Sequence, residues 1–348
     1  MIVLHIGLRK AGSTTIQLFL NDNEEALVGM GIEYPRIGRK MRVDHNNLVN
    51  ELRERKSFDP KYGSLSELQT FWRSSPSNTL IISGETFEAC THAQCLRLKR
   101  ILDRGGEEFR IVLVLRDLLD LMISSYAQKI KFGENTYDFD TFYQDRMNMP
   151  RVNYARTARI WAKIYGWDSL RIRLLDRQHL LNGDLLDDFL TVVGLDIESE
   201  AIRSLPRKGP VNVSPGWKVI EAVRALYLDR AGLPAGHPLA ECKELTTNQR
   251  RVLGANALDL GGELGWNRDR GSYLTREQAE MCYITNRQGV RNLNKNLKEP
   301  LPLPKSLEER GFTARDKIPD VSDIPAAELR DFYDRLGAMP LTWRPGIY

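Results

Sequence analysis

The stretch that most constrains the fold is residues 2–20, where one periodicity gives way to another across a glycine-rich turn. Residues 2–6 are mostly apolar and rich in β-branched side chains, which predicts a buried strand. From Thr14 onward apolar residues recur at helical spacing, beginning with Ile16 and Phe19, which predicts a helix. The chain is therefore expected to begin with a strand, a tight turn and a helix.

The turn itself, Gly7 to Thr15, has the composition of a phosphate-binding loop. Its glycines allow a ligand close to the backbone, and the helix N-terminus offers unpaired N–H groups and a positive dipole end. Lys10 adds a mobile positive charge, and the hydroxyls of Ser13, Thr14 and Thr15 add donors. The alternative interpretation is a strand-to-helix turn with an incidental lysine.

This loop differs from the common nucleotide-triphosphate loop, G-x-x-x-x-G-K-[ST]. Gly7 and Gly12 have the spacing of that motif, but Ser13 stands where its lysine should be. The lysine of this chain, Lys10, comes two residues before the second glycine instead. We therefore expect a phosphate group in a different chemical setting from that of ATP or GTP.

Residues 5–17, HIGLRKAGSTTIQ, resemble the 5′-phosphosulfate loop of sulfotransferases, especially the bacterial pattern H-I-G-x-x-K-T-G-T-T-S-I-Q. The resemblance implies 3′-phosphoadenosine-5′-phosphosulfate (PAPS) as the sulfuryl donor and 3′-phosphoadenosine-5′-phosphate (PAP) as the product. It implies donor contacts from Arg9, Lys10, Ala11, Gly12, Ser13, Thr14 and Thr15. Ala11 replaces the usual Thr or Ser, and Ser13 replaces Thr, so we expect weaker donor contacts rather than a lost site.

A second motif follows the most apolar predicted strand, residues 109–115. Arg116 comes directly after that strand, and Ser124 lies eight residues further on, in a predicted helix. The pattern Arg-x7-Ser-x-Tyr resembles the 3′-phosphate site of sulfotransferases, which implies that Arg116 and Ser124 hold this phosphate. A guanidinium suits the role because its planar fork matches phosphate oxygens. The two motifs occur in the order that the family shows.

Two residues compete for the role of the base that takes the acceptor proton. Glu85 follows the predicted strand 78–83, and the carboxyl ends of parallel strands are where ligands bind in open α/β sheets. His45 has the better ordinary pKa, about 6.5, and similar bacterial sequences often carry a histidine here. Glu85 is favoured, with His45 as its partner or as an acceptor-orienting group. The plainer alternative for Glu85 is a carboxylate favoured by a helix dipole.

A third motif, Arg207-Lys208-Gly209, resembles the late R-K-G of cytosolic sulfotransferases, which binds the 3′-phosphate from a loop. The sequence after this motif follows the bacterial pattern, and in that pattern the loop that contains the motif is variable. Whether Arg207 and Lys208 touch the donor therefore stays open.

Strand–helix alternation recurs along the first 200 residues and predicts a parallel sheet with helices on both faces. It is read at residues 2–27, 79–104, 109–131 and 169–194. We expect an α/β protein with the three-layer, P-loop-like fold of sulfotransferases, as a single domain over 1–348. Residues 1–205 form the cofactor-binding core in this prediction. Residues 206–348 form a helical part that shapes the acceptor pocket.

The predicted function is sulfuryl transfer from PAPS to an acceptor hydroxyl or amine, with a carbohydrate or lipid-linked acceptor favoured by the resemblance. Lys10 and the loop N–H groups lie where charge develops on the bridging oxygen, so no metal is expected. One rival is a P-loop kinase or nucleotide hydrolase, which needs a lysine after Gly12 and an aspartate at a strand end. The other is a non-catalytic nucleotide-binding relative.

Composition narrows the remaining classes. The net charge of +4 is too mild to indicate nucleic acid, although it suits a polyanionic donor. The four cysteines lack the spacing of a metal or redox site. No apolar run reaches the roughly 18–20 residues of a membrane span, and a strand from residue 2 leaves no room for a signal peptide. We expect a cytoplasmic protein whose oligomeric state is open.

Overall fold

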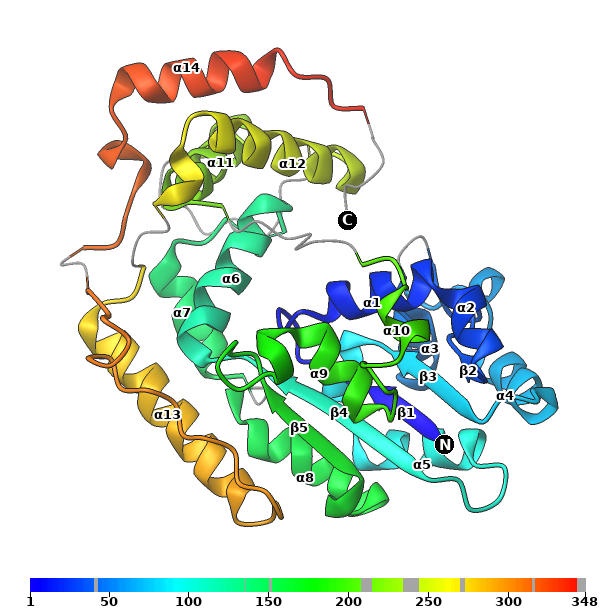
Figure 1. Cartoon of the computed structure of the whole chain (residues 1–348). Helices are drawn as coiled ribbons and strands as arrows, with labels where there is room; N and C mark the ends of the chain where they lie inside the picture. Colours follow the sequence, from blue (N-terminus) through cyan, green and yellow to red (C-terminus); the bar gives the residue numbers. More distant parts are fainter. Residues whose placement is uncertain are drawn as a thin grey trace. The chain divides into compact units, whose positions relative to one another are not determined.

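The computed structural model describes residues 1–40, 43–134, 136–149, 152–207, 215–233, 244–269, 273–314 and 317–342. Within these residues, five strands form one parallel sheet in the order β2-β3-β1-β4-β5 (Figure 1). The strands are β1 (Ile2–His5), β2 (Ile32–Glu33), β3 (Thr79–Ser83), β4 (Phe109–Leu115) and β5 (Leu170–Leu174). The predicted α/β class with a parallel central sheet is confirmed.

The strands predicted at residues 2–6, 78–83 and 109–115 lie within about a residue of their expected bounds, and β5 begins the strand–helix segment predicted at 169–194. Strand β1 is central: Ile2 pairs with Leu80 of β3 on one side and with Phe109 of β4 on the other. All four of its residues are buried, which explains why the run is almost continuously apolar. The short β2 pairs with β3 at the edge of the sheet.

The chain groups into two compact units, each made of several segments. Unit 1 comprises residues 1–117, 153–211 and 286–304 and contains the sheet. Unit 2 comprises residues 118–152, 212–285 and 305–348 and is helical where it is described. The single domain predicted over 1–348 stays a prediction.

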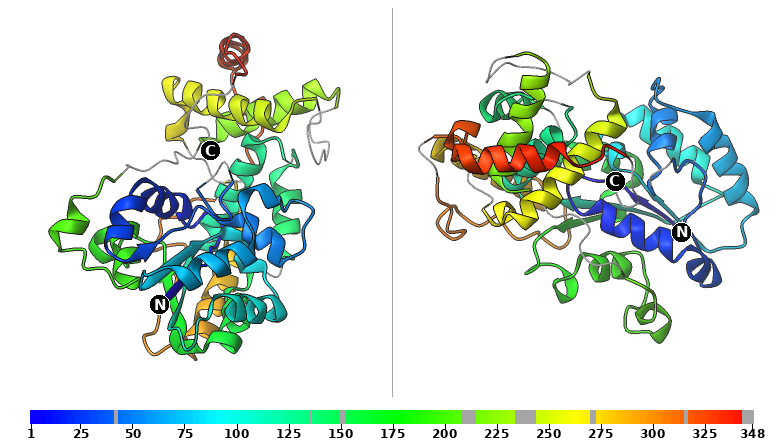
Figure 2. Two further views of the ribbon diagram at one scale, coloured as in Figure 1. Left: turned by 90° about the vertical axis from the view of Figure 1, so that its right-hand side faces the viewer. Right: turned by 90° about the horizontal axis from the view of Figure 1, so that it is seen from above.

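Helices cover both faces of the sheet in unit 1 (Figures 1 and 2). Helices α1 (Ser13–Asp22) and α9 (Leu185–Val192) pack together on one face. On the other face α5 (His92–Leu102) packs against α8 (Tyr154–Tyr165). The remaining elements here are α2 (Glu24–Gly29), α3 (Asn46–Leu52), η1 (Pro60–Tyr62), α4 (Leu65–Ser74), η2 (Glu85–Ala89), η4 (Trp167–Ser169), η5 (Leu181–Gly183) and α10 (Glu200–Arg203).

Unit 2 has its own apolar core, to which Trp217, Tyr126 and Phe332 contribute. Its helices are α6 (Leu118–Lys131), α7 (Phe139–Met147), α11 (Trp217–Arg230), α12 (Thr247–Glu263) and α14 (Ala326–Gly337), with η6 (Trp266–Arg268) and η7 (Val321–Asp323) between them. Helix α13 (Arg276–Asn294) contributes residues to both units. Of the described helices, none combines the length and the apolar character that crossing a membrane requires.

The sequence pattern [ST]-x-x-[EQ] at residues 64–67, 246–249 and 275–278 predicts capping boxes, and all three form. Ser64 and Glu67 cap α4, and Thr246 and Gln249 cap α12, through reciprocal side-chain and backbone bonds. Thr275 exchanges the same pair of bonds with Gln278 at the start of α13.

Candidate functional site

The loop between β1 and α1 lies at the carboxyl edge of the sheet and depends on left-handed backbone at three positions. Gly7, Lys10 and Gly12 have φ values of 101°, 63° and 81°. A Cβ on Gly7 would lie 2.9 Å from the carbonyl oxygen of Glu85, so only a glycine fits there. The first glycine of the loop therefore packs directly on the backbone that carries the predicted base.

The first turn of α1 is open to an anion. Its N-cap residue is Gly12, which has no side chain to cap the helix, and the residues that follow carry hydroxyls rather than carboxylates. Within the described residues, the half-buried Thr14 and Thr15 hydroxyls make no hydrogen bond. The Ser13 hydroxyl is buried and lies 3.5 Å from the Leu8 carbonyl oxygen, so it points into the loop.

Two predicted motifs meet at this edge. The Arg116 guanidinium, just after β4, donates to the carbonyl oxygen of Lys10 at 2.8 Å. The Arg116 carbonyl oxygen accepts from the Tyr154 hydroxyl of α8. Ser124 belongs to unit 2, and its hydroxyl donates to the Leu121 carbonyl one turn earlier in α6. The shared phosphate role of Arg116 and Ser124 stays a prediction.

Glu85 is the first residue of η2, directly after the sheet, and it is half-buried. Within the described residues its carboxylate makes no hydrogen bond or ion pair. Burial raises the pKa of Glu85; the positive charges of Arg9 and Lys10 lower it, and the negative charges of Asp44 and Glu88 raise it. The net direction is upward, so this carboxylate holds a proton more strongly than an exposed one.

His45 is fully buried, and both of its ring nitrogens are engaged by the backbone. The Ser83 N–H donates to Nδ1 at 3.2 Å, which leaves the proton on Nε2, 2.9 Å from the Pro35 carbonyl oxygen. Burial lowers the pKa of His45 to about 3. The predicted roles of His45, alternative base or acceptor-orienting group, do not fit this geometry, because the ring is neutral and both nitrogens are used.

Ser83, the last residue of β3, is a buried hub that the sequence did not single out. Its hydroxyl oxygen accepts from Gln17 Nε2 at 3.0 Å and lies 2.8 Å from His5 Nδ1. Its N–H and carbonyl are both bonded to His45. The hub ties α1, β1 and the start of α3 to the strand end that carries Glu85. Burial lowers the pKa of His5 to about 4, so this ring is neutral too.

The third motif is only partly described. The Arg207 guanidinium forms an ion pair with Asp187 of α9 at 2.6 Å. Lys208 lies outside the described residues. Donor contacts from this loop stay a prediction.

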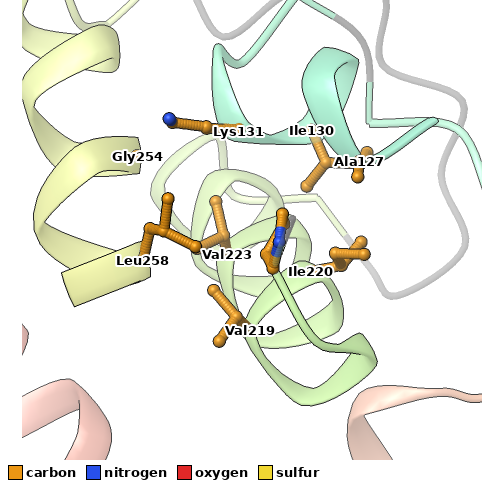
Figure 3. A pocket seen from close by; sticks show the side chains of 9 residues that line it. Ala127, Ile130, Lys131, Val219, Ile220, Val223, Gly254 and Leu258 are labelled. Atoms are coloured by element: carbon orange, nitrogen blue, oxygen red, sulfur yellow. The ribbon is translucent and has the colours of Figure 1, made fainter. Parts of the chain in front are cut away.

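A small crevice in unit 2 offers a different kind of surface (Figure 3). It lies among α6, α11 and α12, with Ile130, Val223 and Leu258 in its lining. Lys131 also lines it, and burial lowers the pKa of that amine. None of the residues predicted for donor or base is among the described residues that line this crevice.

Comparison with protein-family models, with curated proteins and with solved structures finds no match for this chain. The function therefore has to be argued from the loop, from the carboxylate beside it and from the motif resemblance.

Proposed function

We propose that this protein is a PAPS-dependent sulfotransferase with the P-loop-like fold of that family. The observation that carries the proposal is the contact between the loop and the strand end. Gly7, in the loop that bears Lys10, packs on the Glu85 backbone. A positively charged, anion-binding loop therefore lies next to a carboxylate whose pKa is raised. The acceptor is a hydroxyl or an amine, with a carbohydrate or lipid-linked molecule favoured.

The described residues fit a phosphosulfate group. The open first turn of α1 and the hydroxyls of Thr14 and Thr15 suit phosphate and sulfate oxygens. Lys10 supplies the positive charge next to them. Arg116 is proposed to hold the 3′-phosphate, and because a guanidinium has five donors, its bond to the Lys10 carbonyl is compatible with a phosphate contact. When bound, the donor supplies an activated sulfuryl group.

The proposed reaction requires a group that takes the acceptor proton and a group that neutralises the developing negative charge. Glu85 takes the proton of the acceptor while the acceptor oxygen or nitrogen bonds to sulfur and the bond from sulfur to the phosphate oxygen breaks. Lys10 neutralises the charge that grows on that phosphate oxygen. The raised pKa of Glu85 makes it a better general base than an exposed carboxylate.

The decisive experiment is calorimetric titration with PAP and with 5′-AMP, which lacks the 3′-phosphate. We expect PAP to bind the wild-type protein at least about tenfold more tightly, because the 3′-phosphate adds charge-assisted hydrogen bonds. The Arg116→Ala variant should lose most of that preference. Arg110→Ala is the matched control, since Arg110 lies on β4, the strand that Arg116 follows, and pairs with Glu108.

Equal affinity for PAP and 5′-AMP would contradict the proposal. Tight binding of ADP with magnesium, in preference to PAP, would favour the kinase or hydrolase instead. A third outcome would favour the non-catalytic nucleotide-binding relative. In that case the protein binds PAP, but mass spectrometry detects no added sulfo group on any acceptor class.

A further inference from the structure

Two arginines near η2, Arg9 and Arg53, carry guanidinium groups that have no hydrogen bond or ion pair within the described residues. Arg9 belongs to the loop, and its backbone N–H lies 3.4 Å from a carboxylate oxygen of Glu88 in η2. Arg53 follows the last residue of α3. Helix α3 is fixed on η2 because the Thr86 hydroxyl donates to the Asn46 side-chain oxygen at 2.6 Å. Both arginines therefore belong to the η2 side of the loop.

The two guanidiniums act on one another. Burial lowers the pKa of Arg53, and the positive charges of Arg55 and Arg9 lower it further, against the effects of Cys90 and Glu88. Arg53 is half-buried, so its charge is partly desolvated, and no described residue forms an ion pair with it. A ligand anion would attract both guanidinium groups and so offset the cost of the lost hydration and of their mutual repulsion.

The other basic segment near the site is organised differently. Arg36 and Arg39 both form ion pairs with Glu24, at 3.1 and 2.7 Å, and Lys40 donates to the Ser57 carbonyl oxygen. These charges are satisfied within the protein. Among the described residues, Arg9 and Arg53 differ from this segment in having no such partner for their guanidinium groups.

Sheet order places η2, to which α3 and the Arg9 backbone are bonded, on the acceptor side rather than the donor side. Strand β1, with its loop, lies between β3 and β4. Arg116, assigned to the 3′-phosphate, follows β4, whereas Glu85 and η2 follow β3. Arg53 therefore lies on the same side of β1 as the proposed base, and the Arg9 backbone bond to Glu88 ties the loop to that side.

We propose that Arg9 and Arg53 form a subsite for an anionic group of the acceptor, a carboxylate, sulfate or phosphate near the hydroxyl that is sulfated. The inference rests on the proposed function and narrows its acceptor class to acidic molecules. It also moves Arg9 from the donor contacts implied by the motif to the acceptor.

The test uses three fluorescent probes: 4-methylumbelliferyl glucoside, glucuronide and 6-sulfoglucoside. They share a neutral sugar frame and differ in carrying no anion, a carboxylate or a sulfate. Binding to the full-length protein saturated with PAP is followed by fluorescence polarisation at constant ionic strength. We expect at least one anionic probe to bind about tenfold more tightly than the glucoside, and the better of the two identifies the anion.

The Arg9→Ala and Arg53→Ala variants should each lose most of this preference while binding PAP as the wild type does. Lys56→Ala is the matched control, because it removes an exposed positive charge from the same segment as Arg53 and should keep the preference. Arg9→Lys and Arg53→Lys retain the charge and should keep part of it, which separates loss of the subsite from loss of the fold.

Equal binding of the three probes, or no anionic probe bound at millimolar concentration, would overturn the subsite. The subsite would also be overturned if Arg9→Ala weakened the binding of PAP as much as the binding of the anionic probe, because Arg9 would then belong to the donor site. Failure of the proposed function looks different: the wild-type protein would not bind PAP, while the probe preference, measured without PAP, would still report on both arginines.

Discussion

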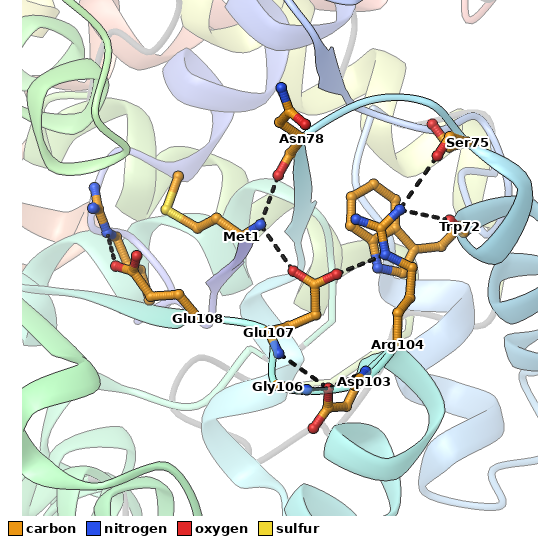
Figure 4. Close-up of polar contacts among 11 residues, drawn as sticks. Met1, Trp72, Ser75, Asn78, Asp103, Arg104, Gly106, Glu107 and Glu108 are labelled. Carbon is orange, nitrogen blue, oxygen red and sulfur yellow. Dashed lines mark hydrogen bonds and ion pairs between the residues drawn. The ribbon is translucent and has the colours of Figure 1, made fainter.

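Carboxylates at the two ends of the parallel strands in unit 1 have opposite environments. We call these ends the amino edge and the carboxyl edge of the sheet. At the amino edge, the Glu107 carboxylate accepts from the Met1 ammonium at 2.9 Å and from Arg104 Nε at 2.6 Å (Figure 4). The Asp103 carboxylate beside it accepts three backbone N–H bonds, from residues 105–107. At the carboxyl edge, Glu85 makes no such bond to any described residue, and the first turn of α1 is uncapped.

The pKa directions of two glutamates express this difference. Burial pushes the pKa of Glu107 upward, but the bonds from the Met1 ammonium and Arg104 outweigh it and lower the pKa. Burial raises the pKa of Glu85, and the nearby cations do not cancel that effect. One carboxylate is thus stabilised in its charged form by folding, and the other is destabilised in it. This is the pattern expected when one edge serves stability and the other serves a ligand.

Replacing Glu85 breaks the functional side of the comparison and should have the largest effect. Glu85→Gln removes the proposed general base, so we expect turnover at saturating donor to fall by about 10²–10⁴. Affinity for PAP, measured by calorimetry, should stay within a few-fold. Normal turnover of this variant would show that another group takes the acceptor proton.

The same variant should be more stable than the wild type above the ordinary range of glutamate titration. The raised folded pKa means that the folded state binds the extra proton, so stability falls as pH rises through the folded pKa of Glu85. Glutamine carries no charge and avoids that loss. Urea unfolding at pH 4 and pH 8 should therefore show a stability gain for Glu85→Gln that grows with pH.

Replacing Lys10 tests the positive half of the same edge. Lys10→Ala should lower turnover by about 10²–10³, or roughly 3–4 kcal/mol, because the proposed charge contact to the developing oxyanion is lost. Far-ultraviolet circular dichroism should show the fold retained, and Lys56→Ala serves as a charge-matched control. If Lys10→Ala turns over like that control, the loop is not the reaction centre.

Replacing Ser83 asks how far the buried hub supports the site. Ser83→Ala leaves the Gln17 amide and the His5 ring without their shared partner, which should cost about 1–3 kcal/mol of stability. Turnover should fall about tenfold as Glu85 loses its fixed position. Ser77→Ala is the control: this buried serine precedes β3 and donates to Glu33. It should lose stability with unchanged turnover per folded molecule.

The sequence predicted the strands well because each buried strand of a parallel sheet is a short apolar run with a defined end. It also brought Lys10 and Arg116 to one edge, since parallel strands end on the same side of the sheet. The sequence does not mark helix α14 as a separate element, because proline and charge in the tail hide a short amphipathic pattern around Phe332 and Leu336.

The environment of His45 could not be predicted, because it depends on Ser83 and Pro35, residues distant in sequence that only the fold brings around the ring. From sequence alone a histidine near the loop looked like a base, whereas complete burial makes it a structural group. The hub at Ser83 was missed for the same reason: a serine at a strand end carries no pattern that reveals three partners.

Replacing Glu107 tests the amino edge and should have the smallest effect on function. Glu107→Gln removes the charge that the Met1 ammonium and Arg104 share, so the free energy of unfolding at pH 7 should fall by about 1–2 kcal/mol. Because the folded pKa of Glu107 is depressed, its stabilisation is present above the unfolded pKa, about 4.3, and is lost as pH falls through the folded value. The stability difference between variant and wild type should therefore shrink in urea titrations below pH 4.

Turnover and PAP affinity of the folded variant should equal those of the wild type, since this edge lies at the opposite ends of the strands from Lys10 and Glu85. A large loss of turnover in Glu107→Gln would mean that the two edges are coupled through the strands and do not divide stability from function.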